Sequence, residues 1–464
     1  MRVEIRGTSI VLPPTPPFNE PHALPLSHLD SHPNLRVPFR YVRAFSSRRE
    51  HILPPESGHI DPLVAISNGL SAALIHYYPF AATLRPCPND PRRLELFSSP
   101  SGQGVPLIHA AANCTLESVE YLDGLEESTG FVEQLAADPT LDQMMINPCI
   151  LQVTIFKCGG FTLGATINHA MCDGAGATQF FWAISELSRG AGKVSVEPIW
   201  DRAALLGPRD PPRVVAPIEE EVRGQAMVTG EGGAAKVVVR EWVHVGDDLV
   251  EMLKAGLVEK CGVRFTTFEA LGAFIWRAKV RASGIPVDDR VTFSYSINIT
   301  KIVKPPLPVG YWGNCCVPVY VDLIASELVN GPIWQTANRI RDSKTRVTDE
   351  YVRSYIDLHE LTSLKDGGAA GATKGRSGHV SGFTDWRHLG HSKLDFGWGG
   401  PVSVVPLTRN ILGSEEPCFF LPYSAPSGGK GRRGGFKVLV NLPEGSVTRF
   451  REEMEKLFKR GCGL

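Results

Sequence analysis

The chain has 464 residues, of which 43% are hydrophobic and 21% are charged, and its formal net charge at pH 7 is −1. A chain of this length can bury a large core, and we expect two domains. The nearly balanced charge argues against a surface that binds nucleic acid.

The sequence has no feature that predicts export or membrane insertion. Its first six residues carry charges where a signal peptide has an apolar core. No run approaches the roughly 18 apolar residues that cross a bilayer. The ten cysteines are scattered without the spacing of metal ligands, so we expect reduced thiols and no bound metal. These observations predict a cytoplasmic protein with no membrane partner.

The first half begins with a strand-like, alternating segment at residues 3–12, which a proline cluster follows. A helix is predicted to begin after Asp61, because Asp61 can cap it and Pro62 suits its first turn. The apolar residues that recur on one face of this helix are Leu63, Ile66, Leu70 and Leu74.

Two apolar runs, at residues 151–156 and 161–167, are split by a pair of glycines and predict a buried hairpin. A helix-like run at residues 179–187 comes next. From residue 190 to about 221 the composition shifts to prolines and charges with few apolar repeats, which is typical of a linker. The chain is therefore predicted to divide into two halves after residue 189.

The second half also mixes strands and helices. A helix is predicted from Thr266, with Glu269 completing a capping box, and a terminal helix is predicted after Ser446. Strand-like runs occupy residues 236–245, 291–297, 315–321 and 436–442. This mixture in both halves predicts α/β layered domains. Two glycine-rich patches, at 366–382 and 427–435, predict surface loops.

The segment from Asn168 to Gly174 is the strongest candidate for chemistry. It lies between a strand-like and a helix-like run and carries His169 and Asp173 four residues apart. A neutral imidazole can accept a proton near neutral pH, while a carboxylate can brace the turn. Small residues at 174–177 would let a backbone or a ligand approach closely. Taken alone, such a spacing is more often structural than catalytic.

Other catalytic signatures are missing from the sequence or fail on context. The sequence contains no G-x-S-x-G elbow, Walker lysine motif, HExxH or CxxC pair. Residues 429–434 spell GxGxxG, but they precede a strand-like run and not a helix, so they do not predict a dinucleotide site. We expect a basic loop there.

A second motif, Asp395-Phe396-Gly397-Trp398-Gly399, lies far along the second half. Two glycines around a tryptophan predict a tight, packed turn whose aspartate is tied to a cation. The physical interpretation of this motif is structural, with no role in proton transfer.

Together these two motifs resemble those of the BAHD acyltransferases, plant enzymes that move an acyl group from coenzyme A to an alcohol or amine. The resemblance runs nearly from end to end. Further segments that are similar to family motifs are Leu26-Ser27-His28-Leu29-Asp30, Tyr77-Tyr78-Pro79-Phe80-Ala81, Pro198-Ile199-Trp200-Asp201-Arg202, Pro305-Pro306-Leu307-Pro308, Gly310-Tyr311-Trp312-Gly313-Asn314 and Thr384-Asp385-Trp386.

The resemblance implies an α/β fold of two similar-sized domains of the chloramphenicol acetyltransferase type, with a channel between them. On this chain the domains would be residues 1–189 and 223–464, joined by a crossover linker at 190–222. Acyl-CoA, as a cosubstrate, and a small-molecule acceptor would enter from opposite faces. No tightly bound cofactor is implied, and the family is usually monomeric.

The resemblance also implies roles for the first motif. His169 would be the general base that deprotonates the acceptor and returns the proton to the coenzyme A thiolate, in a ternary complex without an acyl-enzyme. Asp173 would turn away from the cavity and support His169 by pairing with an arginine. Arg277 and Arg281 are the two candidate partners, and the sequence does not choose between them.

Around the second motif, Thr384 would donate a hydrogen bond to the developing oxyanion and Trp386 would shape the pocket. Residues 395–399 would be structural and distant from the reacting atoms. The chain departs from the family where many members carry an arginine shortly before the P-P-L-P segment. It has Thr300 followed by Lys301 there, so no coenzyme A phosphate contact is assigned.

The sequence therefore predicts an enzyme that moves an acyl group, aromatic or hydroxycinnamoyl, from acyl-CoA to a hydroxyl or amine of a small specialised metabolite. Two alternatives stay open. One is a binding protein that keeps the channel without turnover, and the other is a thioester hydrolase that uses water as the acceptor. The sequence does not identify the acceptor or choose between oxygen and nitrogen.

Overall fold

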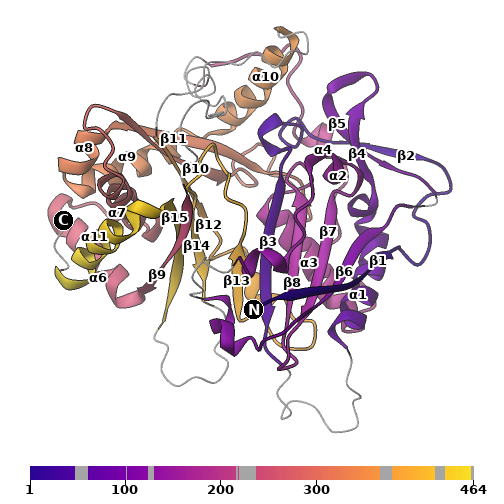
Figure 1. Ribbon diagram of the computed structural model, residues 1–464. Helices are drawn as coiled ribbons and strands as arrows, with labels where there is room; N and C mark the ends of the chain where they lie inside the picture. The colour runs from indigo at the N-terminus through magenta and orange to yellow at the C-terminus, as the bar shows by residue number, and fades with distance from the viewer. Residues whose placement is uncertain are drawn as a thin grey trace.

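The computed structural model describes residues 1–47, 61–100, 102–123, 130–215, 218, 237–365, 379–423 and 434–460. Two six-stranded sheets lie side by side, one built mainly from each half of the chain, and helices cover them (Figure 1). A smaller three-stranded sheet accompanies the first half. Helices and strands alternate in both halves, as the sequence predicts.

The first sheet has the strand order β1-β6-β7-β8-β3-β13, in which β6 and β7 are parallel and the other neighbours are antiparallel. Its strands are β1 (Val3–Val11), β3 (Pro38–Phe45), β6 (Val105–Ala112), β7 (Cys149–Ile155), β8 (Phe161–Asn168) and β13 (Ser403–Pro406). The other elements of this half are α1 (Pro62–His76), α2 (Leu141–Ile146), α3 (Gly174–Ser188), α4 (Arg202–Leu205), β2 (His22–Pro25), β4 (Thr83–Cys87) and β5 (Asp90–Ser98).

The second sheet has the strand order β11-β10-β12-β14-β15-β9. Its strands are β9 (Val238–Gly246), β10 (Arg290–Asn298), β11 (Cys316–Ile324), β12 (His379–Asp385), β14 (Cys418–Pro422) and β15 (Gly435–Pro443). The helices of this half are α6 (Asp247–Cys261), α7 (Thr267–Ala282), α8 (Ala325–Asn330), α9 (Ile333–Thr345), α10 (Asp349–Lys365) and α11 (Val447–Arg460). Helix α7 is buried along almost its whole length, so it forms the centre of this half.

One strand of the second half crosses into the first sheet. Strand β13 pairs antiparallel with β3, from Ser403 opposite Ala44 to Pro406 opposite Tyr41. The chain of the second half therefore completes the sheet of the first half. The division into residues 1–189, 190–222 and 223–464 stays a prediction, and its boundary after residue 222 lies outside the described residues.

Local sequence signals account for several element ends. Asp61 caps α1 by accepting from the N–H of Leu63, and Thr266 and Glu269 form the capping box of α7. The predicted hairpin is confirmed, because β7 and β8 are antiparallel neighbours. Three strong apolar positions of α1, which are Ile66, Leu70 and Leu74, are fully buried.

The glycine-rich patches are partly corrected. Residues 379–382, which we expected in a loop, form the start of β12, and Gly435 begins β15. Most of both patches, and all but the last residue of the GxGxxG run at 429–434, lie outside the described residues. Within the described part of the chain, no helix is long and apolar enough to cross a membrane.

Because α7 is central, its cap gives a direct test of the fold. Thr266→Ala removes the hydroxyl that accepts from the N–H of Glu269 at 3.3 Å. We expect the free energy of unfolding to fall by about 1 kcal/mol. Chemical denaturation of the variant, beside a Thr267→Ala control one position further on, measures the loss. An equal loss in both variants would contradict a specific capping role.

Candidate active site

His169 stands directly after β8, at the turn that leads into α3. Its backbone N–H donates to the carbonyl of Val37, 2.9 Å away and just before β3. On the preceding residue, the buried Asn168 side chain accepts from the N–H of Ala170 at 3.1 Å. The backbone on both sides of the imidazole is therefore fixed by hydrogen bonds.

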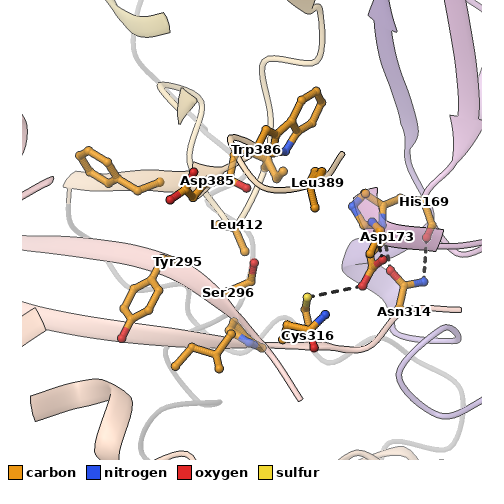
Figure 2. Close-up of a pocket in the computed structure, with 18 of the residues that line it drawn as sticks. His169, Asp173, Tyr295, Ser296, Asn314, Cys316, Asp385, Trp386, Leu389 and Leu412 are labelled. Atoms are coloured by element: carbon orange, nitrogen blue, oxygen red, sulfur yellow. Dashed lines mark hydrogen bonds between the residues drawn. The ribbon is translucent and has the colours of Figure 1, made fainter. Parts of the chain in front are cut away.

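The tautomer of His169 follows from its partner, Asn314. The ring Nδ1 lies 3.1 Å from Oδ1 of Asn314. The amide nitrogen of Asn314 donates to the carbonyl of His169 at 2.9 Å and to Asp30 at 2.8 Å, so the amide oxygen faces the ring. Because that oxygen can only accept, Nδ1 carries the proton and Nε2 keeps its lone pair. Figure 2 shows His169 and Asn314 on one side of the cavity and Trp386 on the other.

Asn314 is held in turn by a buried ion pair. Asp30 accepts from the backbone and side-chain nitrogens of Asn314 at 2.7 and 2.8 Å and lies 3.5 Å from Arg202. Arg202 also donates to the carbonyl of Met171 at 2.6 Å and stacks 3.5 Å from the ring centre of Trp312. Asp30 and Arg202 are both 0% exposed. Removing one of them would strand a buried charge, so this network is strongly constrained.

Burial also determines the protonation of the imidazole. Desolvation lowers the pKa of His169 below its ordinary value of 6.5, and it outweighs the opposing effects of hydrogen bonds and of the Asp173 carboxylate. The ring is therefore neutral at pH 7. A neutral ring whose Nε2 carries the lone pair can accept a proton.

A cavity of about 1100 Å³ extends from His169 between the two halves of the molecule. The first half contributes Phe39 and His169 to its wall, and the second half contributes Tyr295, Thr384 and Trp386. This volume slightly exceeds the usual range for pockets that hold one small ligand. The cavity can therefore accommodate more than one small molecule beside His169.

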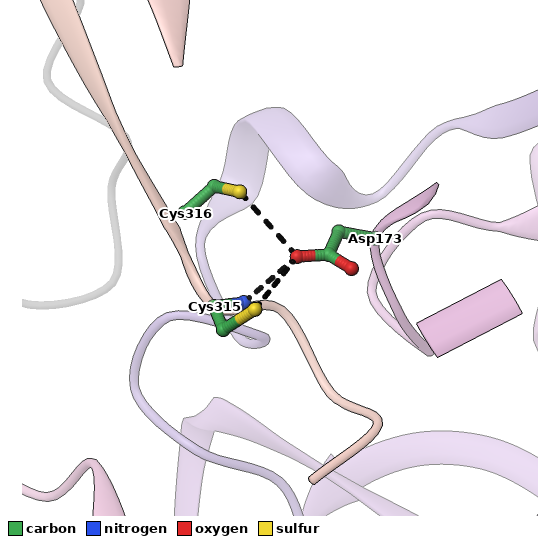
Figure 3. A group of neighbouring side chains, drawn as sticks. All are labelled: Asp173, Cys315 and Cys316. Atoms are coloured by element: carbon green, nitrogen blue, oxygen red, sulfur yellow. Dashed lines mark hydrogen bonds between the residues drawn. The ribbon is translucent and has the colours of Figure 1, made fainter. Parts of the chain in front are cut away.

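Asp173 acts as the N-cap of α3. Its Oδ1 accepts from the N–H groups of Ala175 and Gly176 at 3.0 and 3.1 Å. Its Oδ2 accepts from the backbone N–H of Cys315 at 3.1 Å and lies 3.2 and 3.4 Å from the thiols of Cys315 and Cys316 (Figure 3). The carboxylate thus joins the start of α3 to the start of β11.

The predicted arginine partner of Asp173 is wrong. Arg277 donates to the carbonyl of Gly331 at 3.0 Å, and Arg281 pairs with Glu453 at 3.0 Å. Both arginines lie in the last two turns of α7, and Gly331 and Glu453 belong to the second half. The thiols of the adjacent Cys315 and Cys316 take the place that the sequence analysis gave to a guanidinium.

Asp173, Cys315 and Cys316 also have the donor types of a metal site. Their ligand atoms lie within 4.8 Å of one another. A closed zinc site needs four ligands, and here the backbone N–H of Cys315 occupies the same carboxylate oxygen. The neighbouring thiol, burial and the Asp173 charge hold the pKa of Cys316 well above its usual range. The arrangement therefore fits neutral thiols that donate to a carboxylate.

The small residues after Asp173 serve the packing of the two halves. A Cβ on Gly176 would lie 1.9 Å from the carbonyl oxygen of Trp312, and a Cβ on Gly174 would lie 2.9 Å from Leu389. Glycine is required here because backbone from the second half approaches α3 closely. Gly176 therefore admits a neighbouring backbone, and not a ligand.

Thr384 and Trp386, at the end of β12, line the same cavity as His169. The Trp386 ring packs against Phe39 with centroids 5.6 Å apart, and Phe39 packs against the His169 ring at 5.4 Å. Asp385, which lies between Thr384 and Trp386 in the sequence, forms an ion pair with Arg387 at 2.6 Å. The predicted site residues from the two halves therefore line one cavity.

The motif at residues 395–399 lies apart from the cavity wall. Asp395 accepts from the N–H groups of Gly397 and Gly399 at 2.7 and 2.9 Å, and both glycines have positive φ. Its other oxygen is 3.9 Å from Arg189. The flanking Phe396 and Trp398 rings pack against aromatic residues of β3 and β8. This turn therefore packs against β3 and β8 of the first sheet.

Sequence reasoning missed the residues that orient His169. Asp30, Arg202 and Asn314 each belong to a segment that we matched to the family, but none received a role. A signal was present, because each is a polar residue that ends one of these matched segments. Only their convergence in space shows that they hold the imidazole.

Comparisons with known proteins agree with this architecture. The sequence profile of the Transferase family matches residues 1–457. The chain is 31% identical to a spermidine sinapoyl-CoA acyltransferase of Arabidopsis thaliana, over 94% of this chain and 93% of that protein. It is 31% identical to a 3'-N-debenzoyl-2'-deoxytaxol N-benzoyltransferase of Taxus canadensis, over 88% of this chain and 87% of that protein.

Among solved structures, vinorine synthase is similar with a TM-score of 0.69 at 19% identity, over 98% of both chains. At this identity the likeness concerns the fold. It confirms the predicted fold class, an α/β protein of two chloramphenicol-acetyltransferase-like domains with a channel between them.

Asp173 gives the test of this geometry. Asp173→Ala removes the cap of α3 and leaves the N–H of Cys315 without its acceptor, so we expect a loss of about 2 kcal/mol in unfolding free energy. Asp173→Asn keeps an oxygen that can cap and should lose less. Thermal denaturation of both variants measures the difference. An Asp173→Ala variant with unchanged Tm and no activity would instead indicate a direct role in the reaction.

Proposed function

The chain belongs to the Transferase family of BAHD acyl-CoA-dependent acyltransferases, and we propose that it transfers an aromatic or hydroxycinnamoyl group from coenzyme A to a small metabolite. The acceptor atom is a hydroxyl oxygen or an amine nitrogen. The observation that carries this proposal is the neutral His169, whose Nδ1 faces Asn314 while Nε2 is left for the cavity.

In the proposed reaction, Nε2 of His169 removes the proton of the acceptor as that atom attacks the thioester carbonyl. The new bond joins the acceptor atom to the acyl carbon, and collapse of the tetrahedral intermediate breaks the carbon–sulfur bond. The imidazolium then gives its proton to the departing thiolate. Both substrates are bound together, so no acyl-enzyme forms.

Two further residues support the reacting atoms in this proposal. Thr384 donates its hydroxyl proton in a hydrogen bond to the negative oxygen of the intermediate, and the Trp386 ring bounds the space in which the acyl group moves. Asp173 supports His169 indirectly, by fixing the turn and the start of α3. The motif at residues 395–399 has a structural role.

The choice of an aromatic acyl group rests on two observations. The relatives named above use sinapoyl and benzoyl groups according to their names. The wall beside His169 carries the rings of Phe39, Tyr41 and Trp386, and flat aromatic groups pack well against such rings.

Two alternative functions of the same cavity would differ in whether thiol and acylated product are released. A protein that only binds would take up ligand without releasing thiol. A thioester hydrolase would release thiol at the same rate with or without an acceptor. A panel of acetyl-, benzoyl- and coumaroyl-CoA, with and without alcohols and amines, separates all three outcomes when free thiol and acylated product are both measured by mass spectrometry.

Replacing the proposed base is the direct test. His169→Ala should lower kcat by about 10²- to 10⁴-fold, because proton removal in the transition state is lost. His76→Ala, a histidine that pairs with Glu197 outside the cavity, is the control and should keep the wild-type rate. Equal turnover of the His169→Ala variant and the wild type would remove this histidine from the mechanism.

The pH dependence gives a second test. The base must be neutral, and burial lowers the pKa of His169 below 6.5. Activity should therefore persist as the pH falls to 6.5 and decline only at lower pH, tenfold per unit once the ring is mostly protonated. Initial rates of thioester loss between pH 5 and 8, read as kcat/KM, show this limb. An acid limb centred above 6.5 would contradict a desolvated imidazole base.

A further inference from the structure

Three polar side chains at one end of the cavity keep hydrogen-bonding atoms that no described residue satisfies. Tyr41 and Arg43 lie on the same face of β3 as Phe39, and His391 follows the Trp386 segment. All three line the cavity. Their exposed fractions are 3%, 0% and 3%.

Arg43 has no carboxylate partner among the described residues. Its guanidinium stacks 4.6 Å from the ring centre of Tyr41 and 4.3 Å from that of Phe181. One nitrogen, Nη2, donates to Nδ1 of His391 at 3.3 Å. Nε and Nη1 have no hydrogen-bond partner in the described part of the chain. A guanidinium remains charged in proteins, so a positive charge is buried here with rings and a histidine, and no carboxylate, as its described neighbours.

The neighbouring atoms are donors as well. Because Nδ1 of His391 accepts from Arg43, the proton of this ring lies on Nε2, and Nε2 has no partner among the described residues. The Tyr41 hydroxyl interacts with the Arg43 guanidinium through its oxygen, so its own proton can still be donated. Three buried N–H donor atoms, Nε and Nη1 of Arg43 and Nε2 of His391, therefore have no acceptor that satisfies hydrogen-bond geometry in the described part of the chain. Each such group costs about 1–3 kcal/mol when left unsatisfied, so the arrangement calls for a ligand that accepts hydrogen bonds.

Aromatic rings connect this cluster to His169. The ring centroids of Phe39 and His169 are 5.4 Å apart. The centroid of the Trp386 ring system lies 5.6 Å from that of Phe39, 5.9 Å from that of Tyr41 and 5.4 Å from that of His391. A molecule that reaches both ends needs an apolar body between a nucleophile and an anionic group. The two ends of the cavity together therefore suit one substrate that carries a nucleophile at one end and an anionic group at the other.

We propose that Tyr41, Arg43 and His391 bind the carboxylate of the acyl acceptor, which is a hydroxy acid or an amino acid. This inference rests on the proposed function. A carboxylate matches the fork of a guanidinium and accepts from several donors at once. A polyamine such as spermidine would instead bring cations to a buried positive charge.

Coenzyme A phosphates are the other source of an anion. They carry several negative charges, whereas Arg43 is a single, fully buried cation. Two lysines on helices of the second half, Lys254 and Lys344, also line the cavity and are 30% and 32% exposed. Such partly hydrated cations suit phosphates better than the closed end at Arg43.

The test compares acceptors that differ only in charge. A series of ω-hydroxycarboxylic acids of increasing length, and the matching primary amides, is offered to the wild type with benzoyl-CoA and coumaroyl-CoA. We expect kcat/KM for the best acid to exceed that for its amide by roughly 30-fold or more. The optimal length reports the spacing between the reacting end and Arg43. Spermidine should be a poorer acceptor than the best acid.

Arg43→Met should reduce the acid-to-amide ratio to near one, and Arg43→Lys should give an intermediate ratio, because it keeps the charge and loses the fork. Lys157→Met removes an exposed cation that does not line the cavity and should keep the wild-type ratio. Should Arg43→Met fail to fold, Tyr41→Phe should still lower the ratio. Thermal shifts of the wild type with each acid and its amide provide a second measurement.

The proposal is overturned if the wild type prefers amides or spermidine, or if the ratio is unchanged in Arg43→Met. It is equally overturned if neither acid nor amide is acylated and the acids give no more thermal stabilisation than the amides. If Arg43→Met instead raises KM for acyl-CoA and lowers kcat/KM equally for acid and amide, the anion that Arg43 binds belongs to coenzyme A, and the proposal is wrong. The proposed function and this inference can fail separately. If neutral acceptors give thiol release in the wild type and none in His169→Ala, the proposed function stands even where this inference fails.

Discussion

The side chain of Asn314 is the constraint on which the site depends. Its amide oxygen faces Nδ1 of His169, and its nitrogen donates to the His169 carbonyl and to Asp30. Asn314 belongs to the second half of the chain, whereas His169 and Asp30 belong to the first. The halves must therefore dock correctly before the imidazole has a defined tautomer. Asp30, which pairs with Arg202, accepts from the backbone and side-chain nitrogens of Asn314, so this buried pair holds the second half at the same contact.

Asp173 shows how one carboxylate serves the same docking without an ion pair. It caps α3 with one oxygen and accepts from the backbone and thiol of Cys315 with the other. Neutral donors replace an arginine there, so its negative charge stays close to His169 and favours the imidazolium. Desolvation of the ring outweighs that effect and keeps the imidazole neutral. The site thus combines a nearby carboxylate with an uncharged base.

The cavity carries contrasting charges. Asp385 and Arg387 neutralise each other at 2.6 Å, whereas Arg43 is enclosed by rings and a histidine. In a low-dielectric wall, an unpaired cation acts over a longer range than a paired one. Under the proposal for Arg43, substrate selection at this end of the cavity is electrostatic, while the aromatic wall beside His169 selects by shape.

Much of the fold could be predicted from the sequence, because caps, hairpins and apolar periodicity act between residues close in the chain. The caps at Asp61 and Thr266 and the β7–β8 hairpin are examples. The family motifs predicted the overall architecture and singled out His169. Only the tertiary structure showed that β13 joins the first sheet, that thiols and not an arginine meet Asp173, and that Arg43 meets no carboxylate among the described residues. Such contacts join residues hundreds of positions apart, and no local pattern encodes which of them meet.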